Sequence, residues 1–101
     1  MRVVAAHEID AVLSFPTLIE ALRDAFRGDT VVPTRHHHRI ARPGNEATLL
    51  LMPAWEMRAG GYAGVKIVSV YPENQARGRP SVVGSYLLMD GDSGTPLAVL
   101  D

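Results

Sequence analysis

The middle of the chain reads Gly64-Val65-Lys66-Ile67-Val68-Ser69-Val70. β-Branched residues dominate this stretch, which is typical of a β-strand. Because alternate side chains of a strand point to opposite faces of a sheet, Lys66 is expected to share one face with Val68 and Val70. The residues between them are expected to point to the other face.

Similar short runs of β-branched and aliphatic residues lie on both sides of this stretch, separated by Pro, Gly and Asn. The five predicted strands are Arg35–Ala41, Ala47–Met52, Gly64–Tyr71, Ser81–Met89 and Pro96–Leu100. The turn-forming residues 42–45 and 91–94 predict that the first two and the last two strands form antiparallel hairpins. Residues 72–80, which are rich in Pro, Gly and Arg, are expected to form a polar loop.

Helical periodicity is confined to the N-terminal quarter of the chain. Apolar residues recur at three- and four-residue steps between Phe15 and Phe26, which predicts an amphipathic helix of about three turns. Ser14 is its expected N-cap and Gly28 its expected end. Residues 8–13 predict one or two further helical turns. The whole pattern predicts an α+β fold in which N-terminal helices pack on a mainly antiparallel β-sheet.

Two of the predicted strands contain continuous apolar runs, Leu49–Met52 and Tyr86–Met89, whereas a sheet with one wet face would alternate. A single helix covers only one face. The other face is therefore expected to meet a partner chain or further residues of the same polypeptide. The chain ends at Asp101 directly after a predicted strand, so residues 1–101 are expected to form a single domain that is truncated at its C-terminus.

Composition excludes several classes of protein. The 101 residues carry a net charge of −1 and no cysteine, so a disulfide framework or a catalytic thiol is excluded. A net charge close to zero argues against nucleic-acid and anionic-membrane partners. Neither a signal peptide nor an apolar run of about 20 residues is present. The expected location is cytoplasmic.

Lys66 is the single lysine among ten basic residues. A lysine on an apolar face costs desolvation unless it meets an anion, so it is a candidate for carboxylate binding or proton chemistry; the alternative is a charge that protects an edge strand. Arg35 is expected to begin a strand, because Pro33 favours extended neighbours. Its guanidinium could hold a carboxylate through two hydrogen bonds, or it could be a surface residue.

Three further motifs do not lead to a site. His36 and His38 share a strand face but lack a third metal ligand at a recognisable spacing, so no metal is predicted. Residues 91–96 resemble the segment around a serine-protease nucleophile, yet they join two apolar strands as a turn. Gly60–Gly64 leads into a strand, whereas a phosphate-binding loop leads out of one into a helix.

Six short motifs, in this order along nearly the whole chain, resemble the N-terminal part of the ornithine cyclodeaminase and mu-crystallin family. The motifs are Val32-Pro33-Thr34-Arg35, Leu50-Leu51-Met52-Pro53-Ala54, Gly64-Val65-Lys66, Tyr71-Pro72-Glu73-Asn74, Gly78-Arg79-Pro80-Ser81-Val82 and Thr95-Pro96-Leu97-Ala98-Val99-Leu100-Asp101. The resemblance implies a substrate-binding and dimerisation domain. In the family, a Rossmann domain that binds NAD or NADP is joined to it, and that domain is missing from these residues.

The resemblance also implies roles for individual residues. Arg35 binds the substrate carboxylate, Lys66 lies at that carboxylate and at the reacting centre as the catalytic residue, and Met52 lines the substrate pocket. Ser81 lies where a hydroxyl residue approaches the cofactor. From the sequence alone, Lys66 and Arg35 are each either a functional residue or a charged surface residue. The resemblance favours a functional role for both.

Together these observations predict the N-terminal part of an NAD(P)-dependent ornithine cyclodeaminase-like enzyme, which acts on an amino or imino acid through hydride transfer at Cα. We expect this part to be inactive alone and to form a homodimer through its sheet. The alternative is a non-catalytic dimerisation or interaction module of the same fold. A third hypothesis is a small anion-binding protein that uses Arg35 and the histidines.

Overall fold

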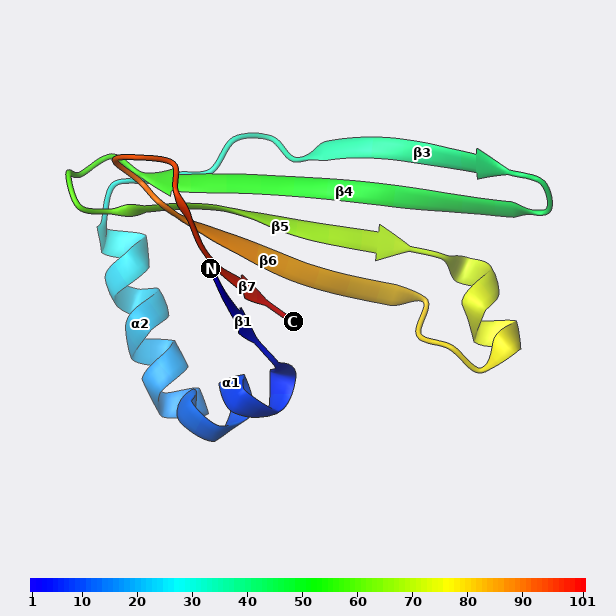
Figure 1. Ribbon diagram of the computed structural model, residues 1–101, viewed down its shortest axis with the longest axis horizontal. Coiled ribbons are helices and arrows are strands. Elements are labelled where there is room, and N and C mark those ends of the chain that lie inside the picture. The colour runs from blue at the N-terminus through cyan, green and yellow to red at the C-terminus, as the bar shows by residue number, and fades with distance from the viewer.

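A computed structural model describes residues 1–101 and has an α+β fold built on one seven-stranded sheet (Figure 1). The strands are β1 (Arg2–Val4), β2 (Thr30–Val31), β3 (His36–Arg42), β4 (Asn45–Glu56), β5 (Tyr62–Val70), β6 (Val82–Asp90) and β7 (Pro96–Leu100). The helices are α1 (Ala6–Val12), α2 (Phe15–Arg27) and the 3-10 helix η1 (Pro72–Arg77), which lies within the predicted polar loop. The predicted α+β class is confirmed.

The sheet has the strand order β1-β7-β6-β5-β4-β2, and β3 also pairs with β4. Both predicted hairpins are confirmed, since β3 pairs with β4 and β6 pairs with β7 in the antiparallel sense. Gly44 and Gly94 in their turns have φ angles of 68° and 72°, which few other residues adopt without strain. β1 pairs with β7 in parallel, so the sheet is mixed and the two ends of the chain lie side by side.

Three features of the sheet differ from the prediction. β1 and β2 are not predicted, because two or three residues are too few to show a strand period. β4 is longer than predicted and runs through Pro53 to Glu56. Pro53 is tolerated because β3 pairs with β4 only as far as Leu51, and β2 pairs with β4 only at Trp55 and Glu56. The outer edge of β4 therefore has no partner at Pro53.

The long helix begins and ends where the sequence predicts, but the helices do not pack on the sheet as expected. The Ser14 hydroxyl accepts a hydrogen bond from the Thr17 N–H at 3.3 Å, and Gly28 is the C-cap. Neither α1 nor α2 contains a buried residue. Phe15 and Phe26 of α2 are 82% and 88% exposed. The reason is the connection: α2 is tied to the sheet through short β2, so it lies beside one end of the sheet (Figure 1).

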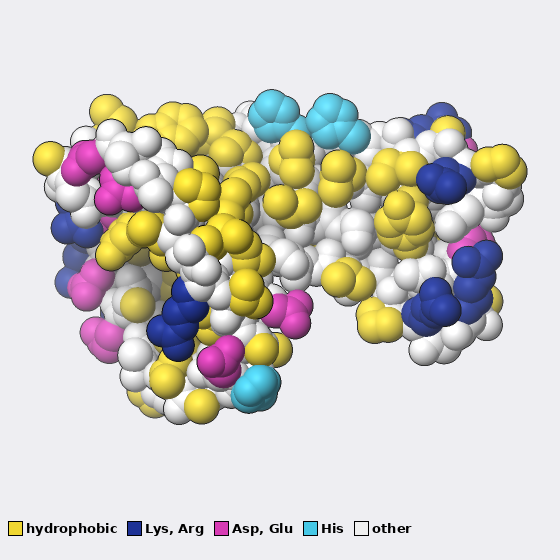
Figure 2. All heavy atoms as spheres, in the orientation of Figure 1, with side chains coloured by type: hydrophobic (Ala, Val, Ile, Leu, Met, Phe, Trp, Pro, Cys, Tyr) yellow, Lys and Arg dark blue, Asp and Glu magenta, His cyan; other side chains and the backbone are white.

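The structure is not compact, and few of its residues are buried. Only 4 of the 101 residues are buried, the accessible surface is 7574 Å², and the radius of gyration is 15.9 Å. A compact chain of this mass has about 5,600 Å² of surface and a radius of gyration of about 13 Å. Figure 2 shows hydrophobic side chains gathered over the middle of the molecule, with histidines along one edge. Much apolar surface is therefore exposed on the sheet.

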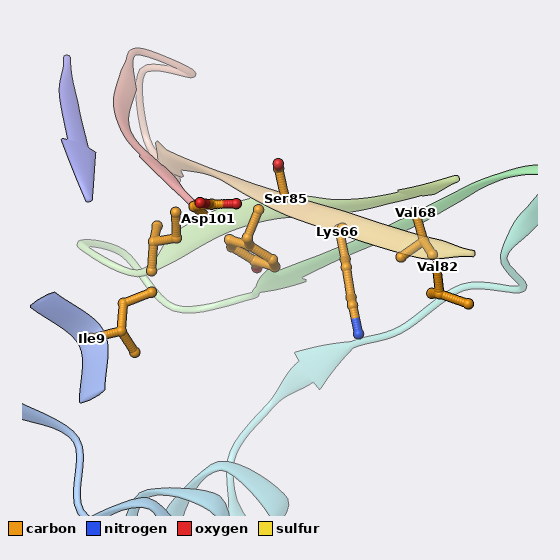
Figure 3. A pocket seen from close by; sticks show the side chains of 9 residues that line it. Ile9, Lys66, Val68, Val82, Ser85 and Asp101 are labelled. Atoms are coloured by element: carbon orange, nitrogen blue, oxygen red, sulfur yellow. The ribbon is translucent and has the colours of Figure 1, made fainter. Parts of the chain in front are cut away.

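The two faces of the sheet carry different side chains. We name them after two neighbours on β5: the Lys66 face and the Ile67 face. Val68, which is 6% exposed, belongs to the Lys66 face, because Lys66, Val68 and Val82 project to the same side of the sheet (Figure 3). The predicted alternation along this strand is confirmed.

Candidate functional site

Four side chains form one row across the Lys66 face. Met52 of β4 pairs with Lys66 of β5, Lys66 pairs with Tyr86 of β6, and Tyr86 pairs with Leu100 of β7. Paired residues of neighbouring strands lie on the same face with their Cβ atoms about 5 Å apart. The sheet therefore brings together Met52 and Lys66, two of the residues that the sequence singles out, although they are 14 positions apart in the chain.

A hollow of about 470 Å³ lies over this row. Lys66, Val68, Gly84 and Tyr86 line it from the sheet, and Ile9 lines it from α1 (Figure 3). The three ion pairs of the chain all join an arginine to a glutamate, so the Lys66 ammonium has no carboxylate partner. An unpaired cation beside apolar side chains is suited to receive the carboxylate of a small ligand.

Tyr86 contributes to this hollow in a way that the sequence does not predict. Its ring crosses β5 at Gly64, where a Cβ atom would lie only 2.6 Å from two of the ring carbons. Burial raises the pKa of the Tyr86 phenol above its usual value of 10.0, so the hydroxyl is protonated at neutral pH. The available signal was Gly64 itself, since a glycine inside a strand often marks the close approach of another group.

Arg35 and Ser81 lie outside the hollow. Arg35 is exposed in the segment before β3. Because His36 pairs with Leu51, continuing the register by one residue would place Arg35 opposite Met52, at the end of the row. Ser81 precedes β6, and its C=O accepts a hydrogen bond from the Tyr71 N–H at 2.7 Å. It lies five residues before Tyr86, which is about 16 Å along a strand.

The histidines of β3 lie apart from Lys66 on the sheet. The rings of His36 and His38 stack with their centroids 6.4 Å apart, and both residues belong to the Ile67 face, opposite Leu51 and Leu49. No group of three or more His, Cys, Asp or Glu side chains is placed to hold a metal ion. No helix of the structure is both long enough and apolar enough to span a membrane.

The residues of this chain do not fit a dinucleotide. Such a cofactor needs a Gly-rich turn that leaves a strand and opens a helix, so that backbone N–H groups meet the pyrophosphate. The four glycines with positive φ lie at positions 44, 60, 78 and 94, and neither α-helix begins at one of them. These 101 residues therefore supply a small-molecule hollow without a pyrophosphate site.

Solved structures share this fold. The Δ1-pyrroline-2-carboxylate reductase of Thermococcus litoralis, solved with NADH and L-proline, matches 99% of the chain at 32% identity with a TM-score of 0.80. An archaeal alanine dehydrogenase dimer with bound NAD matches all of it at 30% identity with a TM-score of 0.79. In both cases the match covers 31% of the solved chain.

Sequence comparisons give the same relationship. The protein SAR DEFICIENT 4 of Arabidopsis thaliana is 32% identical over 97% of the chain, and the match covers 30% of the plant protein. An uncharacterised protein of Schizosaccharomyces pombe is 43% identical over 88% of the chain, which covers 28% of its own length. The chain thus spans about a third of the length of the relatives that it matches. The model of the ornithine cyclodeaminase/mu-crystallin family matches residues 1–101. The chain belongs to this family.

Proposed function

We propose that residues 1–101 form the N-terminal substrate-binding and dimerisation domain of an NAD(P)-dependent oxidoreductase or cyclodeaminase that acts at the Cα of an amino or imino acid. The observation that carries the proposal is the unpaired Lys66 ammonium in a hollow of about 470 Å³. The relatives solved with L-proline or named for alanine and pyrroline-2-carboxylate support the substrate class. Ornithine remains one candidate among these substrates.

In this proposal, Lys66 binds the substrate carboxylate and holds Cα over the row of side chains. Arg35, one residue before the start of β3, is proposed to supply a second cation for that carboxylate. Two cations on one anion fix the orientation of the neighbouring Cα, and this is the main task of such a site. Met52 lines the site as an apolar wall beside Lys66.

A nicotinamide cofactor supplies or accepts the hydride in enzymes of this kind, and here it is held by residues outside 1–101. Ser81 is the proposed point of approach to it, at the end of the sheet where Val70 pairs with Val82. The 101 residues alone are expected to bind substrate without turning it over. Cofactor-dependent turnover of alanine, ornithine or a cyclic imine by these residues would contradict this assignment.

The Ile67 face is the proposed dimer interface. The chain exposes about 2,000 Å² more surface than a compact chain of its mass, and a standard interface needs only about 800 Å² from each partner. One related structure, the archaeal alanine dehydrogenase, is described as a dimer. A non-catalytic dimerisation or interaction module of the same fold is the second candidate. It predicts a dimer that binds no amino or imino acid.

Calorimetric titration with L-proline and L-alanine tests the proposed site. Lys66→Met keeps the length of the side chain and removes its charge, so we expect affinity to fall roughly tenfold to 100-fold, the value of one charge-assisted hydrogen bond. Arg27→Gln on α2 is the matched control for the loss of one positive charge, and its affinity should not change. Equal binding by Lys66→Met and the parent would remove Lys66 from the site. No binding by the parent would favour the non-catalytic module.

A further inference from the structure

The Lys66 face carries a second hollow next to the first. It has a volume of about 220 Å³ and is lined by Thr30 of β2, Ala54 and Glu56 of β4, and Tyr62 of β5. Tyr86 lines both hollows. The ring that crosses β5 at Gly64 is therefore the wall between the Lys66 hollow and its neighbour.

This wall depends on the absence of a side chain at Gly64. An added Cβ there would lie 2.6 Å from the ring of Tyr86 and would force the ring to move. Gly84 also faces the Lys66 hollow, but its added Cβ would lie 3.4 Å from Val68 Cγ2 and 4.0 Å from Lys66 Cε, which are ordinary van der Waals contacts. Of these two glycines on one face, only Gly64 holds the wall in place.

The second hollow offers no free charge to a ligand. Its carboxylate, Glu56, already accepts a hydrogen bond from the Tyr62 N–H at 2.8 Å and pairs with Arg58 at 3.1 Å. Ala54 and the Tyr62 and Tyr86 rings supply mostly apolar surface around it. A side chain that enters this hollow gains most if it is an uncharged hydrocarbon, because a second ammonium would lose its hydration without gaining an unpaired anion.

We propose that Tyr86 determines the side-chain specificity of the site: its ring closes the Lys66 hollow toward the second hollow, so that amino or imino acids with short or compact hydrocarbon side chains are favoured over those whose side chains extend toward the second hollow. The proposal rests on the proposed function, in which Lys66 binds the carboxylate. With that end fixed, the side chain runs along the sheet until it meets Tyr86. Removal of the ring joins the two hollows and admits a longer hydrocarbon chain.

Titration of the 101-residue protein with L-alanine and L-norleucine tests this wall. For Tyr86→Ala we expect the ratio of norleucine to alanine affinity to rise about tenfold or more, as burial of two further CH₂ groups implies. Tyr86→Phe removes only the hydroxyl and should keep the parent ratio. Gly64→Ala displaces the ring and should raise the ratio, whereas Gly84→Ala should not. If Tyr86→Ala does not fold, as judged by circular dichroism, Tyr86→Leu replaces it with the same expected direction.

Two failures are distinguishable in this experiment. If the parent binds neither amino acid, or if Lys66→Met binds both as well as the parent does, the proposed function fails and the inference fails with it. If the parent binds alanine in a Lys66-dependent manner but the ratio is the same in the parent, Tyr86→Ala and Gly64→Ala, the inference alone is overturned. A ratio that rises equally in Gly64→Ala and Gly84→Ala would also overturn it.

Discussion

The two faces of the sheet are made by the same strands and differ in almost everything else. On the Lys66 face, two glycines and a crossing tyrosine ring leave hollows beside an unpaired ammonium. On the Ile67 face, Leu51 pairs with Ile67, and Leu87 pairs with Val65. Because the side-chain period of a strand is two, neighbouring residues can serve a ligand and a partner surface at the same time. On β5, Val68 is 6% exposed, and its neighbour Ile67, on the other face, is 38% exposed.

The largest effect is expected from a charge on the Ile67 face. Ile67→Asp would bury an unpaired carboxylate in the proposed dimer interface, which costs about 3–5 kcal/mol and corresponds to at least a 100-fold weaker dimer. Sedimentation velocity should show a monomer where the parent is a dimer. The control is Val82→Asp on the Lys66 face, at a side chain that is 61% exposed, and this variant should sediment like the parent. A monomeric parent, or a dimer that survives Ile67→Asp, would rule out this interface.

A smaller effect, on the free energy of unfolding, should distinguish the two faces. Val68→Ala removes two methyl groups from a buried position of the chain itself and should lower the free energy of unfolding by about 2 kcal/mol at every protein concentration. For Ile67→Ala, the loss in free energy of unfolding should instead depend on protein concentration, because in the proposed dimer the partner subunit buries the Ile67 side chain. Urea denaturation at two concentrations measures both, and Val82→Ala is a control with an expected effect within about 0.5 kcal/mol. A concentration-independent cost at Ile67 would mean that the chain buries this side chain by itself.

The smallest effect is expected at the turn between β6 and β7, which fixes the register of these two strands and so keeps their side chains on the correct faces. Asp90 accepts hydrogen bonds from the Ser93 N–H, the Ser93 hydroxyl and the Asp92 N–H, and these bonds lower the pKa of its carboxyl below the usual 3.8. A slip of one residue between β6 and β7 would exchange their faces. Since the folded-state pKa is lowered, the stabilisation is present above about pH 3.8 and is lost as the pH falls through the lowered pKa.

Asp90→Asn tests this dependence, because the amide keeps the shape but cannot carry the charge. We expect the urea midpoint of the parent to exceed that of Asp90→Asn near pH 6, and the difference to shrink as the pH approaches about 3. A difference that stays constant over this range would show that the charge of Asp90 does not stabilise the turn.

Part of the site was predictable because it depends on local pattern. The alternation along 64–70 places Lys66 and Val68 on one face, and the turn residues fix both hairpins, whatever the rest of the chain does. The role of Tyr86 was not predictable from local pattern, because Tyr86 lies in a continuous apolar run that shows no alternation between the two faces. Its position over Gly64, which is 22 positions away in the chain, depends on the register between β5 and β6.

Local residue patterns were enough to predict the class of the fold, the long helix with its Ser14 cap, the hairpins and the side of the sheet on which Lys66 lies. These follow from residue period, turn chemistry and capping, which act over a few residues. The folded structure was needed to show that β1 joins β7, that α2 lies beside one end of the sheet, and that Tyr86 divides two hollows next to Lys66. These depend on which distant strands pair and in which register, and no local pattern specifies that choice.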